Sequence, residues 1–250
     1  MTKILIPIET SIGERRVSAT PETVKKLKNL GCDVYIEKSA GELSGFKDFS
    51  YEESGGIIFT EQDFNLWKEV DIIFCIHCPD YEKLNKLKEG CLIIGLLNPF
   101  GNKDLAKLLS DLKLSAIALE LLPRISRAQS SDVLSSQANI AGYKSVLLAA
   151  SELDRYFPML MTAAGTVQPA KVVVLGGGVA GLQAVATAKR LGALVFVSDI
   201  RPAVKEQVES LGAKFINLPE IDEKPTESGG YAKAVSTKFL EEQRAILSKH

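Results

Sequence analysis

The segment 121–143, LLPRISRAQSSDVLSSQANIAGY, concentrates side chains that form hydrogen bonds and ion pairs directly after an apolar run. Guanidinium, carboxylate and amide groups bind and orient a polar ring or a carboxamide, and none of them is an activated nucleophile. The sequence therefore predicts a recognition loop. The alternative interpretation is a solvated loop whose Ser135 or Ser136 caps the following helix. The charged and amide side chains of the loop are Arg124, Arg127, Gln129, Asp132 and Gln137.

A glycine-rich turn at 176–181, GGGVAG, contains the pattern GxGxxG and follows the apolar run KVVVL. Gly176 permits a tight turn, Gly178 lets the backbone approach a pyrophosphate, and Gly181 lets a helix pack closely on the strand. A helix that starts here also offers unpaired N–H groups and the positive end of its dipole to a phosphate. The turn predicts a dinucleotide site, with an ordinary glycine-rich helix start as the alternative.

An acidic residue, Asp199, ends the next apolar run, LVFVSD. Its carboxylate can accept hydrogen bonds from ribose hydroxyls and would repel a 2′-phosphate, which favours NAD(H) over NADP(H). Arg201 points the other way, because an arginine near this position can serve the phosphate of NADP. The alternative is a solvated acidic residue at the end of a strand.

Two cysteines and a histidine, Cys75, His77 and Cys78, lie together in FCIHCPD. A zinc site needs four ligands, usually in two pairs, and only the isolated Cys32 and Cys91 remain to complete one. A thioredoxin-like redox pair should open a helix, whereas Cys75 lies inside an apolar run. We therefore interpret this segment as buried small residues near the end of a strand.

The bulk composition is that of a globular protein: 250 residues, 46% hydrophobic, 24% charged, with a net charge of −1. This charge gives no electrostatic reason to expect nucleic acid or an anionic membrane as a partner. No apolar run has the roughly 18–20 residues that a transmembrane helix needs. The N-terminus lacks the features of a signal peptide, so a cytosolic protein with reduced thiols is expected.

Short apolar runs alternate with amphipathic segments, a pattern typical of α/β proteins with a mostly parallel sheet and helices on both faces. Strands are expected at 3–8, 33–37, 71–76, 91–97, 115–121, 171–175, 194–199 and 214–218. Helices are expected from Thr20-Pro21 to Gly31, near 61–69, 81–89 and 103–112, at about 136–156, over Pro202–Leu211 and at about 232–249, and the composition of 219–230 predicts a mobile segment.

These elements predict two Rossmann-like, doubly wound parallel-sheet domains, 1–137 and 138–250, with a cleft between them. The second domain supplies three strands, whereas a doubly wound dinucleotide fold usually has about six. We therefore expect this domain to be truncated at its C-terminus, in a fragment or a split product. Ligands of such sheets lie beyond the carboxyl ends of the strands, so the loop 121–136 is expected to face the glycine turn across the cleft.

The stretches PRISRAQSSDVLSSQANIAGY and MTAAGTVQPAKVVVLGGGVAGLQAVATAKRLGA resemble the NAD(H)-binding component of proton-translocating nicotinamide nucleotide transhydrogenases, within the alanine dehydrogenase/transhydrogenase superfamily. The resemblance covers the whole chain, from ERRVSATPETV onward. It implies that the Arg-Gln-Asp signature of the family falls on Arg124, Gln129 and Asp132, and that Ser135 also holds the nicotinamide carboxamide. These four residues are the expected catalytic set.

The resemblance also extends to the end of the chain. The mobile-loop signature GGYAK of the family matches residues 229–233, and Gln243 matches a nucleotide contact in the helix that follows. No metal ligand is expected. The expected cofactor contacts are Arg124, Ile125, Ser126, Gln129, Asp132, Gly176, Gly177, Gly178, Val179, Gly181, Asp199, Ile200, Arg201, Gly230, Tyr231 and Gln243.

By this resemblance the protein is an oxidoreductase that exchanges hydride between its NAD(H) and NADP(H) on a partner component, coupled to proton translocation. The implied partners are that NADP(H)-binding component, a membrane component and a second copy in a homodimer. The implied location is the cytoplasmic face of the inner membrane, reached through the complex. Direct transfer between rings needs positioning rather than an acid or a base, which suits the residues of the loop.

The rival interpretation is alanine dehydrogenase, a related amino-acid oxidoreductase that needs a proton-transferring group and a cation for the keto acid. In that family these are a histidine and a lysine, and the matching positions here are Asn98 and His77. Asn98 cannot transfer a proton at neutral pH. Arg16 matches an arginine that both families have. A third possibility, a non-catalytic NAD-binding module, would explain the glycine turn but not the loop.

Overall fold

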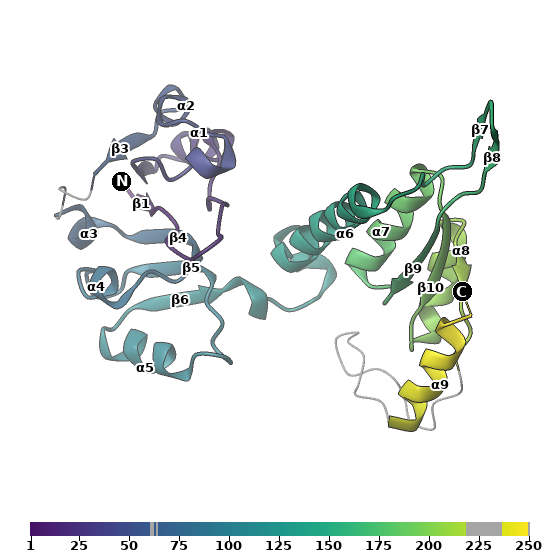
Figure 1. Cartoon of the computed structure of the whole chain (residues 1–250). Coiled ribbons are helices and arrows are strands. Elements are labelled where there is room, and N and C mark those ends of the chain that lie inside the picture. The colour runs from purple at the N-terminus through teal and green to yellow at the C-terminus, as the bar shows by residue number, and fades with distance from the viewer. Residues whose placement is uncertain (61–62, 64, 219–236, 250) are drawn as a thin grey trace. The chain divides into compact units, whose positions relative to one another are not determined.

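The computed structural model describes residues 1–60, 63, 65–218 and 237–249, and divides the chain into two compact units. Unit 1 is Met1–Asp132 and unit 2 is Val133–His250 (Figure 1). The boundary expected between residues 137 and 138 falls inside the helix α6 (Val133–Glu152). In the part of the chain that the structure describes, no helix combines the length and the apolar character needed to span a bilayer.

Unit 1 contains a six-stranded parallel sheet in the order β3-β2-β1-β4-β5-β6. This is the usual strand order of doubly wound dinucleotide folds, with the reversal of direction between β1 and β4. Figure 1 shows the strands running in this order from β3 at one edge to β6 at the other. The strands are β1 (Lys3–Ile6), β2 (Asp33–Glu37), β3 (Ile57–Phe59), β4 (Ile72–His77), β5 (Leu92–Leu96) and β6 (Ser115–Ala118).

The helices of unit 1 cover this sheet because local signals start them and apolar side chains bury them. Before α1, the side chain of Thr20 accepts a hydrogen bond from the Thr23 N–H, and Pro21 occupies the first turn. Leu5 and Ile73, on the two central strands, are fully buried. The helices are α1 (Pro21–Asn29), α2 (Asp48–Glu53), α3 (Leu66–Glu69), α4 (Tyr81–Leu84) and α5 (Lys103–Asp111), with 3₁₀ turns η1 (Glu42–Ser44), η2 (Leu119–Leu121) and η3 (Ser126–Ser131).

Unit 2 contains a parallel sheet whose described strands run in the order β11-β10-β9, and a separate antiparallel hairpin of β7 and β8. A core of small and β-branched residues, among them Val185, Val195 and Val197, joins the sheet to its helices. The elements after α6 are β7 (Leu160–Thr162), β8 (Gly165–Val167), β9 (Lys171–Leu175), α7 (Val179–Arg190), β10 (Leu194–Ser198), η4 (Pro202–Val204), α8 (Lys205–Ser210), β11 (Lys214–Phe215) and α9 (Thr237–Leu247).

The helices α6 and α7 pack against each other at very short range. A Cβ atom at Gly142 of α6 would lie 2.1 Å from the carbonyl oxygen of Ala180 in the first turn of α7. Only glycine therefore fits at position 142. This contact fixes the N-terminal end of α7, which carries the glycine turn.

The α/β class and the parallel sheets predicted from the sequence are confirmed, and several element bounds are corrected. The strand expected at 115–121 ends at Ala118, because residues 119–121 turn into η2. The helix expected from residue 136 begins at Val133, which places Ser135 and Ser136 inside it and not at its cap. The short β3 and the β7–β8 hairpin were not predicted. The expected segment 219–230, residues 61, 62 and 64 of one expected helix, and the start of the last one lie outside the described residues.

Candidate functional site

The glycine turn of unit 2 joins the strand β9 directly to the long helix α7. Gly176 has φ +93°, a left-handed conformation that favours glycine, and Gly178 is the N-terminal cap of α7. A Cβ atom at Gly181 would lie 1.8 Å from the carbonyl oxygen of Gly176, so helix and turn are in direct backbone contact. The cap and first residues of α7 therefore present backbone N–H groups beyond the end of β9, as an anion site requires.

The approach to this turn is open where a phosphate would need space. Around a Cβ atom built on Gly178, the nearest atom is Nη2 of Arg201 at 4.0 Å, and around Gly176 no atom lies within 4 Å. These two glycines leave room above the helix end that side chains would fill. The turn fits the pyrophosphate of a dinucleotide, and Val179 begins the helix at this point.

Asp199 follows β10 and lies buried beside the turn. Its Oδ2 accepts hydrogen bonds from the Gly177 N–H at 2.7 Å and from Nη2 of Arg201 at 2.8 Å. Its Oδ1 accepts from the backbone N–H and Nε of Arg201, at 2.8 and 2.9 Å. Burial raises the pKa of Asp199, but these hydrogen bonds outweigh burial and hold the pKa below its ordinary value. The carboxylate is ionised at neutral pH.

Other expected nucleotide contacts of unit 2 lie at the same edge or outside the described residues. Nε2 of Gln243, on α9, donates to Oγ of Ser198 at 3.4 Å, which brings α9 to the end of β10. Ile200 lies half-buried between Asp199 and Arg201 in the chain. Gly230 and Tyr231 lie outside the described residues.

The polar loop of unit 1 leaves the carboxyl end of β6, as predicted, through η2 and then η3. Backbone hydrogen bonds from Ala128 N–H to Ile125 O at 2.9 Å and from Asp132 N–H to Gln129 O at 3.3 Å hold it in a 3₁₀ conformation. Arg124 and Gln129 are exposed, and Asp132 is half-buried. The loop thus offers its side chains outward from an ordered backbone.

The rest of the expected loop set divides between the two units. Ile125 and Ser126 are exposed at the start of η3, in unit 1. Ser135 belongs to the first turn of α6, in unit 2. The chain connection from Asp132 to α6 is therefore included in the candidate site.

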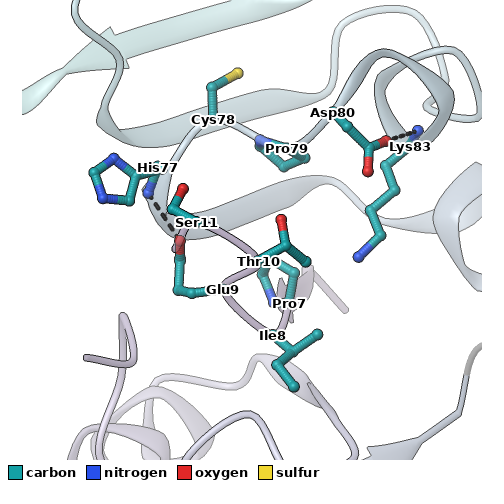
Figure 2. Close-up of a pocket in the computed structure, with 10 residues that line it drawn as sticks. All are labelled: Pro7, Ile8, Glu9, Thr10, Ser11, His77, Cys78, Pro79, Asp80 and Lys83. Carbon is teal, nitrogen blue, oxygen red and sulfur yellow. Dashed lines mark hydrogen bonds between the residues drawn. The ribbon is translucent and has the colours of Figure 1, made fainter. Parts of the chain in front are cut away.

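Unit 1 has a pocket of its own at the point where the strand order reverses. Residues 7–11, after β1, form one wall, and residues 77–80 with Lys83 form the other (Figure 2). Glu9 closes the end of β4 by accepting hydrogen bonds from the backbone N–H groups of Ile76 at 2.6 Å and His77 at 3.1 Å. The loop after β1 therefore commits a carboxylate to the neighbouring strand.

A second carboxylate, Glu14, pairs with the two cationic candidates of unit 1. It accepts from Nε and Nη2 of Arg16 at 2.8 and 2.6 Å, and Nε2 of His77 lies 3.0 Å away. The hydrogen bond from Arg16 lowers the pKa of Glu14 to about 2. Sequence reasoning missed Glu9 and Glu14, because their partners lie on a strand far along the chain.

The CxxC segment behaves as a structural element in this geometry. Cys75 is buried on β4, and its Sγ lies 3.6 Å from the carbonyl oxygen of Ile94. Burial raises the pKa of Cys75 far above its usual range and that of Cys78 to about 11. Thiols of this kind are poor nucleophiles, which agrees with the structural interpretation.

Comparison with known proteins places the two units in one family. Residues 5–141 match the alanine dehydrogenase/PNT N-terminal domain, and residues 145–247 match the corresponding C-terminal domain. The chain is 45% identical, over 99% of its length, to the first of the separate polypeptides that form the NAD(P) transhydrogenase alpha subunit of Rhodospirillum rubrum. It is 32% identical, over 84% of its length, to "Alanine dehydrogenase 2" of Staphylococcus aureus.

Solved structures give the same result. A transhydrogenase from Sinorhizobium meliloti superposes with a TM-score of 0.82 at 48% identity, covering 86% of this chain and 64% of that one. An L-alanine dehydrogenase superposes with a TM-score of 0.73 at 28% identity, covering 86% of this chain and 60% of that one. The chain spans 66% of the length of the Rhodospirillum relative and 56% of the Staphylococcus one. With both domains matched, and with the resemblance seen in the sequence confirmed, the chain belongs to the alanine dehydrogenase/PNT family.

Proposed function

We propose that this chain is the NAD(H)-binding component of a proton-translocating NAD(P) transhydrogenase. In this function, hydride is exchanged directly with NADP(H) held on a partner component, and the exchange is coupled to proton translocation. The observation that carries the proposal is the outward-facing polar set of η3, which can bind and orient a nicotinamide ring and contains no activated nucleophile. The transhydrogenase relatives at 41–45% identity support it.

The residues of unit 2 bind the cofactor and set its position. When bound, NADH supplies a hydride, and direct transfer between two rings moves no proton to a heteroatom. The N–H groups of the glycine turn and the N-terminal end of α7 hold the pyrophosphate. Asp199 accepts hydrogen bonds from the adenosine ribose and disfavours a 2′-phosphate, so NAD(H) and not NADP(H) is the cofactor of this chain.

The loop residues position the reacting ring. Arg124 and Asp132 make charge-assisted hydrogen bonds on the NAD side, and Ser135 holds the carboxamide. Gln129 is neutral and long, and it can donate and accept at once, so it suits a bridge to the nicotinamide on the partner component. Its exposure in unit 1 agrees with a role at an interface.

The amino-acid dehydrogenase function is the weaker candidate. Asn98, at the position of that family's histidine, cannot transfer a proton at neutral pH. Its N–H donates to Glu120 Oε1, and its φ of +48° places it in a tight turn after β5. Arg16, which would hold a keto-acid carboxylate, already pairs with Glu14. A proton-transferring group and an anion receptor are both compromised.

The complex belongs to the same proposal. The partners are the NADP(H)-binding component and a membrane component, and the chain acts as a homodimer. It is peripheral on the cytoplasmic face of the inner membrane through that complex. The transhydrogenase relatives are named as alpha subunits or as pieces of one, which supports a role within a larger assembly.

The experiment compares binding and transfer after one conservative change. Gln129→Asn keeps the amide but withdraws it by one methylene, so transfer from NADH to NADP⁺ in single-turnover stopped flow should slow by about 100-fold. NADH affinity, measured by calorimetry, should stay within about twofold. The matched control is Gln207→Asn, the same change on the exposed face of α8. Wild-type transfer by Gln129→Asn, or a defect recovered by more NADH, would reduce the loop to a binding element. Absence of NADH binding by the wild-type chain would refute the function itself.

A further inference from the structure

The carboxylate that should receive the adenosine ribose already has all its acceptor sites occupied. An ionised carboxylate offers about four lone-pair sites. Asp199 receives four hydrogen bonds between 2.7 and 2.9 Å, one from the Gly177 N–H and three from Arg201. Its side chain is only 4% exposed. Two ribose hydroxyl donors cannot be added to this arrangement without displacing donors that are present.

The donors that can leave are those of the Arg201 side chain. The Gly177 N–H and the Arg201 N–H belong to the backbone, which is fixed by the turn and by the end of β10. Nε and Nη2 of Arg201 form a two-point pair with the carboxylate, on a side chain that is 20% exposed. Rotation of the guanidinium group would free one lone-pair site on each carboxylate oxygen.

The guanidinium group also lies where the cofactor must approach. Nη2 of Arg201 is the nearest atom to a Cβ built on Gly178, the cap of α7. A cation at the N-terminal end of a helix is disfavoured by the helix dipole. The pair with Asp199 is therefore what stabilises Arg201 in this place, and loss of that pair would leave a guanidinium group beside an anion site.

We propose that Arg201 is the specificity-determining residue of this nucleotide site, and that it works by competition with the ribose for Asp199. While Asp199 is ionised and holds the guanidinium group, Arg201 is an internal substitute for the ribose hydroxyls and is withheld from any 2′-phosphate. When Asp199 cannot hold it, Arg201 becomes the receptor for a 2′-phosphate. This inference rests on the proposed binding of NAD(H) to unit 2.

The competition gives expectations that a simple contact role does not. If Arg201 only contacted bound NADH, its removal would weaken binding. If it competes with the ribose, Arg201→Met, which keeps the alkyl stem and removes the donors, should tighten NADH binding by about fivefold. Asp199→Asn, which keeps the shape but not the charge, should change the preference from NADH to NADPH by about tenfold or more, because it releases the guanidinium group.

The experiment is calorimetric titration of the whole chain with NADH and with NADPH, for the wild type, Arg201→Met, Asp199→Asn and the double variant. The control is Arg190→Met, the same change at the exposed last residue of α7. Tighter NADH binding by Arg201→Met, together with NADPH preference in Asp199→Asn that the double variant loses, supports the proposal. Weaker NADH binding by Arg201→Met, or an unchanged preference in Asp199→Asn, overturns it.

The design separates this inference from the function on which it rests. A wild-type chain that binds neither nucleotide refutes the proposed function, whereas a wild-type chain that binds NADH with Arg201→Met binding less tightly refutes only the competition. Circular dichroism of each variant identifies a folding failure. If Asp199→Asn does not fold, the direction of the affinity change in Arg201→Met alone decides the proposal.

Discussion

The two units share a hydrogen bond at corresponding positions and use it for different ends. In unit 1, the backbone N–H of Ile8, two residues beyond β1, donates to the carboxylate of Glu37 at the end of β2, at 2.8 Å. In unit 2, the N–H of Gly177, two residues beyond β9, donates to Asp199 directly after β10, at 2.7 Å. Both carboxylates are buried, and each has a cationic partner.

The difference lies in the segment after the first strand of each unit. In unit 2 the glycine turn leads at once into α7, so the end of a helix with unpaired N–H groups faces the carboxyl edge of the sheet. In unit 1 residues 7–20 separate β1 from α1, and Glu9 takes up N–H groups of β4. An acidic residue at the end of the second strand is thus a structural feature of both units. The glycines and the immediate helix distinguish the one with a dinucleotide site.

The largest expected effect comes from filling the closest backbone contact in unit 2. Gly181→Ala would place a Cβ atom 1.8 Å from the carbonyl oxygen of Gly176, and neither backbone segment can yield without breaking the turn. The free energy of unfolding should fall by about 3 kcal/mol or more, measured by urea titration followed by circular dichroism. Ile12, the same number of residues beyond the first strand of unit 1, is fully exposed, and Ile12→Ala should change little. A stable Gly181→Ala would mean that α7 does not need this close contact.

The next effect tests whether the shared carboxylate is structural in unit 1. Glu37→Ala leaves the Ile8 N–H and the ammonium group of Lys83, which lies 3.5 Å from Glu37, without this acceptor. Loss of one partner from a buried pair should lower the free energy of unfolding by roughly 3 kcal/mol. Trp67, the single tryptophan of the chain, lies buried in unit 1 and reports this unfolding by fluorescence.

The same variant should leave nucleotide binding intact. NADH affinity of Glu37→Ala at a temperature where it is folded should match that of the wild type, because Glu37 belongs to unit 1. Weaker NADH binding without a loss of stability would contradict the division of roles between Glu37 and Asp199.

A third change should affect binding and leave the fold almost unchanged. Gly178 has an ordinary φ of −76°, and the nearest atom to its Cβ would be Nη2 of Arg201 at 4.0 Å, so Gly178→Ala fits without strain. The cost in stability should be about 0.5 kcal/mol, from a poorer helix cap. The methyl group would occupy the approach of the pyrophosphate, and NADH affinity should fall by about tenfold in a calorimetric titration. Unchanged affinity would place the phosphates elsewhere.

The sequence predicted local features better than contacts between distant segments. The glycine turn, the start of α1 at Thr20-Pro21 and the strand β9 follow from short patterns, so their positions were predicted well. The loop after β6 was located, but its 3₁₀ conformation was not, because exposed polar residues allow many backbone conformations.

The carboxylates of unit 1 show why the rest was missed. Glu9 and Glu14 act on backbone and side-chain groups of β4, and only the folded sheet brings these segments together. No spacing in the sequence signals such a pair. Asp199 was found, since it follows a strand after a glycine turn, but its pairing with Arg201 is a matter of side-chain geometry.

The smallest expected effect concerns the carboxylate pair that distinguishes the first loop of unit 1. The hydrogen bond from Arg16 lowers the pKa of Glu14 from 4.5 to about 2 in the folded protein. A carboxyl whose folded pKa is depressed stabilises the fold above its unfolded pKa, and this contribution is lost as the pH falls from about 4.5 toward 2. The Arg16 side chain is 40% exposed, so solvent screens the pair, and we expect about 1 kcal/mol.

Glu14→Gln tests this contribution by its dependence on pH. In the wild type, the free energy of unfolding of unit 1, followed by Trp67 fluorescence in urea, should decrease between pH 5 and pH 3. In Glu14→Gln the decrease should be smaller by about 1 kcal/mol, because the amide does not titrate. Glu53→Gln, at an exposed position at the end of α2, is the matched control and should follow the wild type. Equal decreases in wild type and Glu14→Gln would show that Arg16 does not hold Glu14 in solution. Arg16 would then be available to an anion, and the amino-acid dehydrogenase function would gain support at the expense of the transhydrogenase proposal.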